Sequence, residues 1–502
     1  MVQRVATVAF EGIEARAVDV QVQVAPGLPA FNVVGLPDKA VSEARERVRA
    51  ALVASGLALP ARRITVNLAP ADVPKEGSHY DLPIALGLMA AIGALPADAL
   101  SGFTVLGELG LDGSIAAVAG VLPAAIGANA RGEGLICPAA CGAEAAWASP
   151  EMEIVAAASL IQLANHFRGT QVLARPQPKV RETSDALIDL KDIKGQESAK
   201  RALEVAAAGS HNLLLLGPPG SGKTMLARRL PSILPPLTLD EAIEVTAIHS
   251  VAGLLDGRPL VTARPVRAPH CTISDAALLG GGHPIRPGEI TLAHRGVLFL
   301  DELPEFRRNV LEPLRQPLEE RRLTVARGSG AVVFPADVQL VAAMNPCPCG
   351  LLGDPSDVCR CSPPLLERYR ARISGPLLDR IDLHVEVSRV PVGALADDGA
   401  VAEPSATVRA RVAAARARQV SRRGCVNARL GGREVRRACR LGPAGHRLLE
   451  LSSERLGLSA RAYTRILRVA RTIADLAGET DVSTSHVAEA IQYRSLDRRT
   501  RP

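Results

Sequence analysis

The strongest constraint on the fold is an apolar segment that runs directly into a glycine-rich loop at residues 211–224, HNLLLLGPPGSGKT. An apolar strand followed by GxxxxGKT and a helix is the pattern of a phosphate-binding loop. The glycines permit a tight turn whose backbone N–H groups face the β-phosphate, Lys223 reaches the β- and γ-phosphate oxygens, and Thr224 offers its hydroxyl to Mg²⁺. We therefore predict that ATP and Mg²⁺ bind at Gly217, Pro218, Pro219, Gly220, Ser221, Gly222, Lys223 and Thr224.

A second apolar strand, GVLFLDE at residues 296–302, ends in two acidic residues. Elsewhere an Asp-Glu pair after a strand is more often a helix cap. Downstream of a phosphate loop it predicts the hydrolytic half of an ATPase, in which Asp301 holds Mg²⁺ and Glu302 orients or deprotonates the attacking water.

Three further polar residues follow or precede apolar segments in an order typical of ATPases. Asn345, after VQLVAAMNP, is predicted to sense the γ-phosphate, the alternative being a turn-forming Asn before Pro. Arg380, in GPLLDRIDLHVEV, is predicted as an arginine finger for a neighbouring subunit. Its alternative is an internal salt bridge with Asp379 or Asp382. Arg461 begins a predicted helix and is a candidate second phosphate sensor that would contact the nucleotide.

A chain of 502 residues is too long for one core and predicts about three domains. With 47% apolar and 22% charged residues, each domain can bury a core. Residues 1–168 mix strands (18–24, 63–68 and 103–106) with helices (40–52 and 82–92), so we predict an α/β domain. A linker at 169–188, a second α/β domain at 189–390 and an Arg-rich helical domain at 391–502 follow.

The N-terminus lacks the apolar core of a signal peptide, and the longest apolar run, residues 82–95, is too short to cross a bilayer. We therefore expect a soluble, cytoplasmic protein without membrane contact. Basic charge is concentrated at one end: residues 404–502 hold 21 Arg, no Lys and 8 acidic residues, whereas the first 403 residues carry a net charge of −6. Clustered arginine favours a phosphate-binding surface, the alternative being a solvated helical face.

Several longer stretches carry a resemblance to a known family: residues 27–52, residues 267–282 (RAPHCTISDAALLGGG), the NPCPCG segment and LSARAYTRILRVARTIADL. With the motifs above, the chain resembles AAA+ ATPases, and among them the magnesium-chelatase-like branch that includes the MCM helicases. It is most similar to the ComM/YifB family of bacterial proteins. The resemblance implies an N-terminal Lon-protease-like domain of the ribosomal S5 type, a central AAA+ P-loop core with a parallel sheet, a C-terminal helical lid and hexameric rings. It also implies branch migration of DNA in natural transformation.

The N-terminal domain departs from Lon-type peptidases at both catalytic positions. PKEGSH at residues 74–79 places His79 where the nucleophilic serine is expected, and Leu122 falls near the place of the dyad lysine. Ser78 is one residue out of register. We therefore predict that this domain has no peptidase activity.

Two insertions in the core are candidates for DNA contact. Residues 267–289 form a Gly-rich polar loop with His270, His283 and Arg286, and residues 318–334 read as a hairpin with Arg327, Gly328 and Gly330 at its turn. Alternatively, both loops face only solvent or a neighbouring subunit. Aromatic residues make up 2% of the chain, so base stacking should contribute little, and binding should be salt-dependent and sequence-independent.

Four cysteines in two tight pairs, Cys347/Cys349 and Cys359/Cys361, follow Asn345. The spacing C-x-C-x9-C-x-C can place four thiolates around a tetrahedral Zn²⁺ in a structural, closed site. A redox-active or disulfide-bonded cluster and incidental thiols are the alternatives.

Together these features predict an ATP-hydrolysing hexameric DNA motor, a helicase or branch-migration translocase acting in DNA uptake or recombination. The alternative is an AAA+ remodelling ATPase or chelatase-type motor that acts on a protein partner. A Lon-like ATP-dependent protease ranks last because the catalytic dyad is absent.

Overall fold

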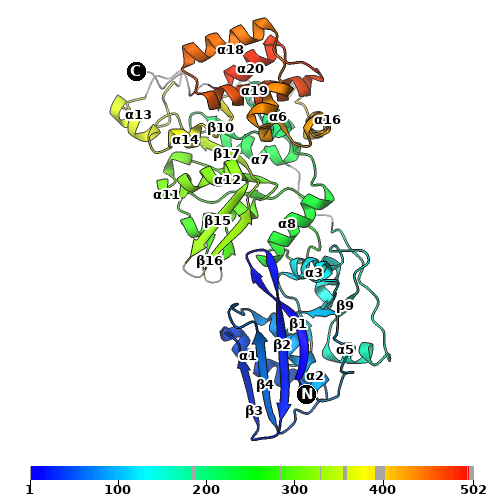
Figure 1. Cartoon of the computed structure of the whole chain (residues 1–502). Helices are drawn as coiled ribbons and strands as arrows, with labels where there is room; N and C mark the ends of the chain where they lie inside the picture. Colours follow the sequence, from blue (N-terminus) through cyan, green and yellow to red (C-terminus); the bar gives the residue numbers. More distant parts are fainter. Residues whose placement is uncertain are drawn as a thin grey trace.

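The computed structural model describes residues 2–181, 188–282, 285–327, 330–353, 359–390, 402–494 and 496. Three groups of elements follow one another along the molecule (Figure 1). The N-terminal unit lies at one end, the unit with the phosphate loop is central, and the C-terminal helices lie at the other end. The predicted α/β class is confirmed, whereas the residue boundaries predicted between the domains stay predictions.

The N-terminal unit is built on a seven-stranded mixed sheet in the order β3-β4-β2-β1-β5-β8-β9. Its strands are β1 Val2–Glu11, β2 Glu14–Ala25, β3 Ala30–Val34, β4 Arg63–Ala69, β5 Phe103–Val105, β8 Gly134–Pro138 and β9 Ile154–Ala157, with the small pair β6 Glu108–Leu109 and β7 Ile115–Ala116 beside it. Its helices are α1 Lys39–Ala54, α2 Asp81–Ala91, α3 Val121–Ala130, α4 Gly142–Ala145 and α5 Leu160–Phe167. All strands and helices predicted from periodicity are present. In β2 every second residue from 18 to 24 is apolar, and Val18, Val20 and Val22 are buried in the core, as expected for a strand with one buried face.

The described part of the predicted linker, residues 169–181, forms no helix or strand and lies against the N-terminal unit. Arg175 donates hydrogen bonds to the carbonyls of Met152 (3.0 Å) and Ser149 (2.7 Å), and Pro176 packs on Gly142. These contacts anchor the segment to the N-terminal unit.

The central unit contains a five-stranded parallel sheet in the order β11-β14-β17-β10-β18. The strands are β10 Leu213–Leu216, β11 Val266–Arg267, β14 Val297–Leu300, β17 Gln339–Met344 and β18 Leu383–Glu386. Every residue of β10, β14 and β17 is buried, as expected for parallel strands covered by helices on both faces.

Helices and two hairpins surround this sheet. The helices are α6 Glu197–Gly209, α7 Lys223–Ile233, α8 Leu239–Val251, α9 Asp275–Leu279, α10 Glu289–Leu292, α11 Arg308–Leu311, α12 Arg315–Glu320, α13 Pro363–Arg370 and α14 Gly375–Leu378. The hairpins are β12 Gly280–Gly281 with β13 Arg286–Pro287, and β15 Arg322–Arg327 with β16 Gly330–Pro335. The second hairpin confirms the one predicted for residues 318–334.

The C-terminal helices are α16 Ser405–Arg423, α17 Gly432–Ala438, α18 Pro443–Leu456, α19 Ala460–Ala477 and α20 Thr484–Gln492. The hydroxyl of Ser459 accepts the N–H of Ala462 at 3.1 Å and so caps α19, as its sequence position indicates. Side chains of α16, α19 and α20 share one hydrophobic core with α6, α7 and β10. The C-terminal helices are therefore packed onto the central unit. Within the described ranges, no helix is both long and apolar enough to cross a membrane.

Two contacts join the N-terminal unit to the core. At the first contact, the N–H of Gly120, the residue before α3, donates to the Oγ of Ser250 in α8 at 3.0 Å. The Ser250 hydroxyl in turn donates to the buried carboxylate of Glu144 at 2.5 Å. Burial raises the pKa of Glu144. At the second contact the β1–β2 turn touches β16, because a Cβ on Gly12 would lie only 2.4 Å from Val332 Cγ1. Figure 1 shows these hairpins side by side.

The residues at the two positions expected for a Lon-type catalytic serine and lysine make structural contacts. His79 is buried, with its Nε2 2.8 Å from the carbonyl oxygen of Val8, and burial lowers its pKa. Leu122 is buried and its N–H donates to Glu144 at 3.0 Å. The hydroxyl of Ser78 donates to the carboxylate of Glu108. The absence of peptidase activity stays a prediction.

Candidate nucleotide site

The phosphate loop connects the carboxyl end of β10 to the amino end of α7, in the predicted strand, loop and helix order. Gly220 (φ +76°) and Gly222 (φ +91°) adopt the left-handed backbone conformation that favours glycine. Gly217 is required for a different reason, since a Cβ there would lie 2.1 Å from the carbonyl oxygen of Val387. The three predicted glycines therefore each have a steric cause.

The ammonium group of Lys223 lies between the loop and the end of β17. Its Nζ donates to the carbonyls of Gly217 (2.8 Å) and Pro218 (2.9 Å), and to Asn345 Oδ1 at 3.2 Å. Burial lowers the pKa of Lys223. The lysine is thus in direct contact with the residue predicted to sense the γ-phosphate.

Thr224 and Asp301 form the second contact across the site. The Thr224 hydroxyl donates to Asp301 Oδ2 at 2.8 Å, and the two oxygens belong to the ligand type that Mg²⁺ prefers. Asp301 follows β14 and Asn345 follows β17, the strand between β14 and β10. The carboxyl ends of three adjacent parallel strands therefore bring the predicted residues together.

Glu302 lies at the same edge with an exposed side chain. Its φ of +53° is uncommon for a residue other than glycine, and its N–H donates to Asp301 Oδ1 at 3.0 Å. Strained backbone of this kind is found preferentially at functional sites, where the surrounding structure holds it in place. The role of Glu302 as the residue that orients or deprotonates the attacking water stays a prediction.

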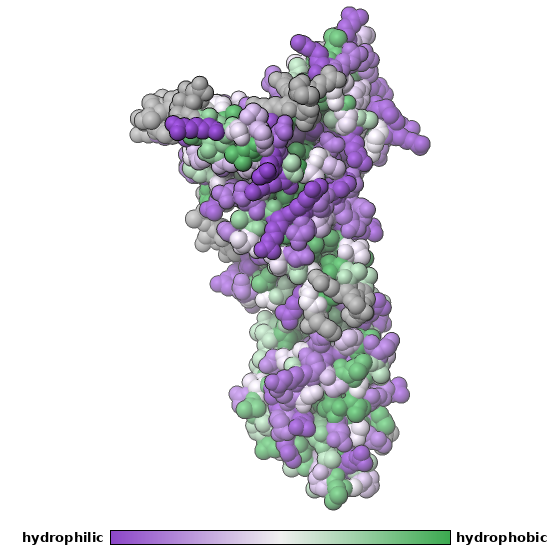
Figure 2. All heavy atoms as spheres, turned by 90° about the vertical axis from the view of Figure 1, so that its left-hand side faces the viewer, coloured by the Kyte–Doolittle hydropathy of each residue, from purple (hydrophilic) through white to green (hydrophobic). Residues whose placement is uncertain are grey.

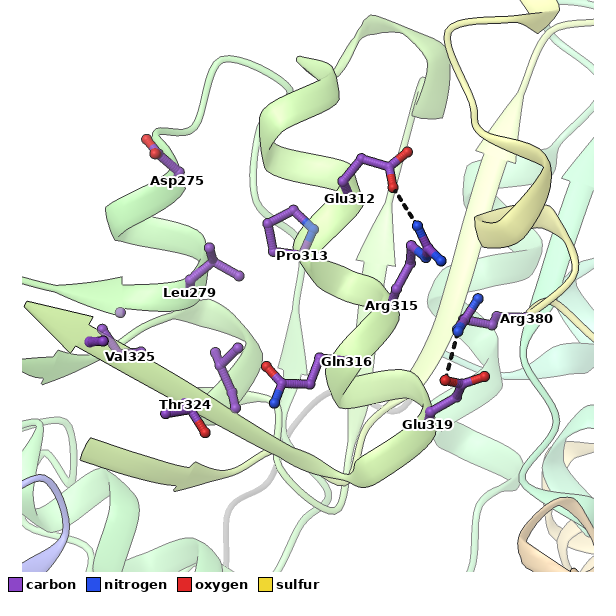
Figure 3. A pocket seen from close by; sticks show the side chains of 13 residues that line it. Asp275, Leu279, Glu312, Pro313, Arg315, Gln316, Glu319, Thr324, Val325 and Arg380 are labelled. Atoms are coloured by element: carbon purple, nitrogen blue, oxygen red, sulfur yellow. Dashed lines mark hydrogen bonds and ion pairs between the residues drawn. The ribbon is translucent and has the colours of Figure 1, made fainter. Parts of the chain in front are cut away.

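Arg380 lies at the opposite, amino-terminal edge of the sheet, just before β18. Its Nη2 is 2.6 Å from Glu319, and its Nη1 donates to the carbonyl of Pro376 at 2.6 Å. The guanidinium is buried and borders a cavity of about 530 Å³ (Figure 3). Arg380 thus forms a salt bridge within its own chain, which was the alternative to the finger role. The partner is Glu319, however, and not Asp379 or Asp382. The finger role stays a prediction.

Arg461 also lies at this edge, on a cavity of about 420 Å³ that Ser210, Asn212 and Glu319 help to line. Its side chain is exposed. Asp382, two residues after Arg380, instead accepts a hydrogen bond from Arg465 Nη1 at 2.5 Å, and its Oδ2 lies 3.2 Å from His211 Nδ1. The structure does not bring Arg380 or Arg461 together with Lys223, because strands of four residues, about 13 Å long, separate the two edges.

Comparison with known proteins agrees with this arrangement. Residues 189–395 match the family described as magnesium chelatase, subunit ChlI, residues 20–141 match subunit ChlI of Mg-chelatase, and residues 402–494 match the ChlI C-terminal family. The competence protein ComM of Haemophilus influenzae is 46% identical over 492 residues, which are 97% of this chain and 96% of ComM. The uncharacterized protein YifB of Salmonella typhimurium is 45% identical over 487 residues, 97% and 96% of the two chains. The chain belongs to the ComM/YifB family.

Membership of this magnesium-chelatase-like family confirms the predicted AAA+ type of core. The likeness to Lon is partial: Lon protease 2 of Bacillus subtilis is 32% identical over 152 residues, which cover 26% of this chain and 25% of that protein. The family assignment therefore agrees with a nucleotide-binding P-loop core, whereas the roles of individual site residues rest on the geometry above.

The four predicted cysteines lie together beside this nucleotide site. Cys347 Sγ is 3.3 Å from Cys349 Sγ and 3.8 Å from Cys359 Sγ, and the four sulfurs all lie within 4.8 Å of one another. A tetrahedral site with Zn–S bonds of about 2.3 Å needs sulfurs about 3.8 Å apart. The donor set and its spacing therefore fit Zn²⁺. All nine cysteines are free thiols, which disagrees with a disulfide-bonded cluster in this state.

Contacts within the four-cysteine cluster favour thiolate at Cys349 but not at every position, because neighbouring thiols raise the pKa of Cys359 to about 12 and also raise that of Cys361. The N–H of Leu352 donates to Cys347 Sγ at 3.3 Å. The N–H of Leu351, together with neighbouring thiols, lowers the pKa of Cys349 to about 6. Thiolate is the form that ligates a metal.

The candidate DNA loops are only partly described. β12 and β13 pair within the first loop, where Arg267 holds Glu289 with two hydrogen bonds of 2.5 and 2.7 Å. His270 is exposed and Arg286 lies in β13. His283 and Gly328 lie outside the described residues, as do the side chain of Arg327 and the surroundings of Gly330. DNA contact by these loops stays a prediction.

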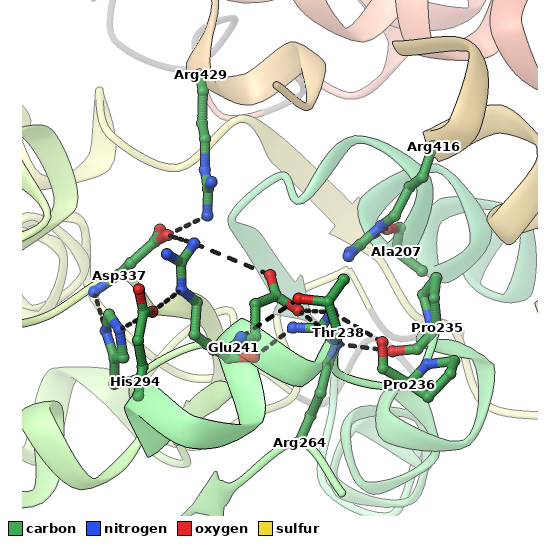
Figure 4. A network of polar contacts seen from close by, with 12 residues as sticks. Ala207, Pro235, Pro236, Thr238, Glu241, Arg264, His294, Asp337, Arg416 and Arg429 are labelled. Carbon is green, nitrogen blue, oxygen red and sulfur yellow. Dashed lines mark hydrogen bonds and ion pairs between the residues drawn. The ribbon is translucent and has the colours of Figure 1, made fainter. Parts of the chain in front are cut away.

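A polar network that the sequence analysis did not identify connects the C-terminal helices to β17 (Figure 4). Asp337, two residues before β17, accepts from Arg295 Nη1 at 2.9 Å and from Arg429 of the C-terminal region, and its N–H donates to His294 Nδ1 at 3.0 Å. β17 is thus tied at its amino end to the helical region and carries Asn345 at its carboxyl end. These residues are far apart in the chain and have no shared local pattern, so no sequence motif could identify them.

Proposed function

We propose that this chain is an ATP-hydrolysing hexameric motor that moves DNA, a helicase or branch-migration translocase acting in DNA uptake or recombination in the cytoplasm. The observation that carries the proposal is the convergence of Lys223, Thr224, Asp301, Glu302 and Asn345 at one edge of the parallel sheet. A relative that aligns over 96% of its length is named a competence protein, which supports a role in natural transformation.

The site residues divide the chemistry of ATP cleavage between them. Lys223 and the loop N–H groups bind the phosphates, and Thr224 and Asp301 hold Mg²⁺. Glu302 activates the attacking water, and Asn345 senses the γ-phosphate. Mg²⁺, when bound, neutralises the charge that develops on the phosphoryl oxygens.

The positions of two arginines support the proposal of an oligomer. Arg380 and Arg461 lie at the edge of the sheet opposite the phosphate loop, so they serve the nucleotide of a neighbouring subunit. A head-to-tail contact of this kind closes into a ring when the rotation between neighbouring subunits closes, and otherwise gives an open filament. We propose a hexamer in which each nucleotide is bound by one subunit and completed by the next.

The C-terminal arginines fall into two groups, which bears on DNA binding. Some are structural: Arg422 holds Asp475 at 2.6 Å and Arg471 is buried. Others are exposed and have no partner among the contacts of the described residues, namely Arg433, Arg436, Arg437 and Arg440 in and after α17. Figure 2 shows hydrophilic side chains gathered over the core and the C-terminal helices. We propose that the exposed group contacts phosphates of the DNA backbone.

The test is ATP hydrolysis by the purified wild-type protein with and without single-stranded and branched DNA. We expect DNA to stimulate hydrolysis, with DNA affinity falling about 10³-fold or more between about 50 and 200 mM salt if six or more phosphates are contacted. Lys223→Ala, which lacks the phosphate-binding ammonium, is the control and should show no hydrolysis under either condition. Hydrolysis that is indifferent to every DNA tested would contradict the proposal.

A second proposal concerns the four-cysteine cluster, which we propose holds a structural Zn²⁺. Four thiolates close the coordination sphere and leave no position for a substrate, so the ion has no direct catalytic part. We expect about one zinc per chain after purification under reducing, chelator-free conditions. Cys359→Ser should lower that content, whereas Cys425→Ser, outside the cluster, should not. A zinc-free wild-type protein would contradict the assignment.

The alternative is a remodelling or chelatase-type motor that acts on a protein. The magnesium-chelatase 67 kDa subunit of Chlorobaculum parvum is 26% identical over 164 residues, 32% of this chain, so the core alone does not separate the two functions. Hydrolysis stimulated by a protein client and by no DNA would favour this alternative. The exposed arginines of α17 favour DNA.

A further inference from the structure

The turn formed by residues 347–350, which contains the first cysteine pair and ends at Gly350, lies directly against the phosphate loop. Gly350 has a φ of +80°, and a Cβ at this position would lie 2.4 Å from Pro219 Cδ and 2.7 Å from Pro219 Cγ. The same Cβ would be 3.8 Å from Asn345 Cγ. Only a residue without a side chain allows this approach. Gly350, which directly follows the first cysteine pair, therefore packs on the predicted phosphate-binding loop and lies near Asn345, the predicted γ-phosphate sensor.

The second cysteine pair returns to the same place through α13. This helix begins two residues after Cys361 and contains Tyr369, which is 7% exposed. Burial raises the pKa of the Tyr369 hydroxyl to about 12, and the nearby backbone of Asn345 opposes this rise. Asn345 thus lies near both chain segments that supply the cysteines, while its own Oδ1 accepts from Lys223 at 3.2 Å.

We propose that the zinc-loaded four-cysteine cluster is a positioning element of the ATPase site, which sets the phosphate loop through Gly350 and the γ-phosphate sensor through Asn345. The inference rests on the proposed ATP hydrolysis. Four Zn–S bonds hold the segments on either side of the cluster in one arrangement, and a displacement of about 1 Å at a reacting centre can cost about 100-fold in rate. Loss of the metal therefore lowers kcat and leaves nucleotide binding largely intact, because the loop N–H groups and Lys223 remain.

Two glycines in this segment provide a matched test of the contact. Gly350 (φ +80°) and Gly353 (φ +81°) have nearly the same backbone conformation, but a Cβ on Gly353 would meet nothing within 4 Å. Alanine at either position carries the same backbone cost. We expect Gly350→Ala to lower kcat about 10-fold or more, with full zinc content and a nucleotide affinity within about threefold of wild type, and Gly353→Ala to behave as wild type. Equal kcat values for the two variants would overturn the contact.

Removal of the metal ligands tests the metal's part. Cys359→Ser combined with Cys361→Ser leaves Gly350 and Asn345 unchanged, and should lose zinc and kcat together while a fluorescent ATP analogue still binds. Cys425→Ser should keep both. A zinc-free double variant with wild-type kcat would overturn the inference and leave the proposed motor function standing.

Failure of the proposed function would look different, because wild-type protein would then hydrolyse no ATP at all, although zinc content and nucleotide affinity could still be measured. Circular dichroism of the double variant separates misplacement from unfolding, and an unfolded double variant would leave the decision to the zinc-loaded Gly350→Ala protein.

Discussion

Glu302→Gln is expected to lower kcat for ATP hydrolysis by about 10²–10⁴-fold while nucleotide affinity stays near the wild-type value. The amide keeps the size and the strained φ of +53° but cannot accept a proton from water. The hydrogen bonds of Lys223, Thr224 and Asp301 do not involve the Glu302 side chain, so the binding of nucleotide and Mg²⁺ proposed for these residues should persist in the variant. Phosphate release in a single turnover and binding of a fluorescent ATP analogue measure the two quantities separately.

Glu305→Gln is the matched control for Glu302→Gln. Glu305 lies three residues further along the same segment and pairs with Arg372 at 2.8 Å, at the surface. The same chemical change there should leave kcat within about twofold, since exposed ion pairs contribute little. Wild-type hydrolysis by Glu302→Gln would remove Glu302 from the mechanism, and an equal loss in both variants would indicate a general effect on the loop.

Arg380→Ala is expected to lower kcat by about 10³–10⁵-fold, the usual range for an arginine finger. The structural alternative is that Arg380 serves only to pair with Glu319. Glu319→Gln separates the two, because it removes that ion pair and keeps the guanidinium. We expect Glu319→Gln to retain most of the activity, and an equal loss in both variants would support the salt bridge as the only role.

Mixing inactive subunits tests whether Arg380 acts across the ring. A Lys223→Ala subunit carries an intact Arg380, and an Arg380→Ala subunit carries an intact Lys223. Random mixing of the two pairs an intact loop with an intact finger at about a quarter of the interfaces of a closed ring. We expect hydrolysis to reappear in the mixture at about that fraction of wild type. A mixture no more active than the two separate proteins would contradict a shared site.

The sequence could predict the residues at the carboxyl edge of the sheet because each directly follows a buried strand. Asp301 follows β14, Asn345 follows β17 and the loop follows β10, so an apolar run and its last polar residue suffice to locate them. In the N-terminal unit the strands β2, β4 and β5 and the helices α1 and α2 were predictable because their apolar pattern is local, whereas the other strands and helices of this unit were not identified from the sequence.

Contacts between distant segments could not be predicted in this way. The pairing of Arg380 with Glu319, the approach of Gly350 to Pro219 and the link from Ser250 to Glu144 all join parts of the chain that no periodic pattern relates. The nearest acids in the sequence, Asp379 and Asp382, suggested a local partner for Arg380. The turn of the chain before β18 instead directs that guanidinium toward α12, and Asp382 pairs with Arg465.

The most direct test of the account is strand exchange on a branched DNA substrate by the wild-type protein with ATP and Mg²⁺. We expect labelled strand to be released with ATP, and no release with Glu302→Gln, although this variant should bind both ATP and the DNA. The same experiment at raised salt should lose activity together with DNA binding. Exchange that proceeds equally in Glu302→Gln, or wild-type protein that hydrolyses ATP in the presence of the branched DNA but moves no strand, would contradict the proposal of an ATP-driven DNA motor.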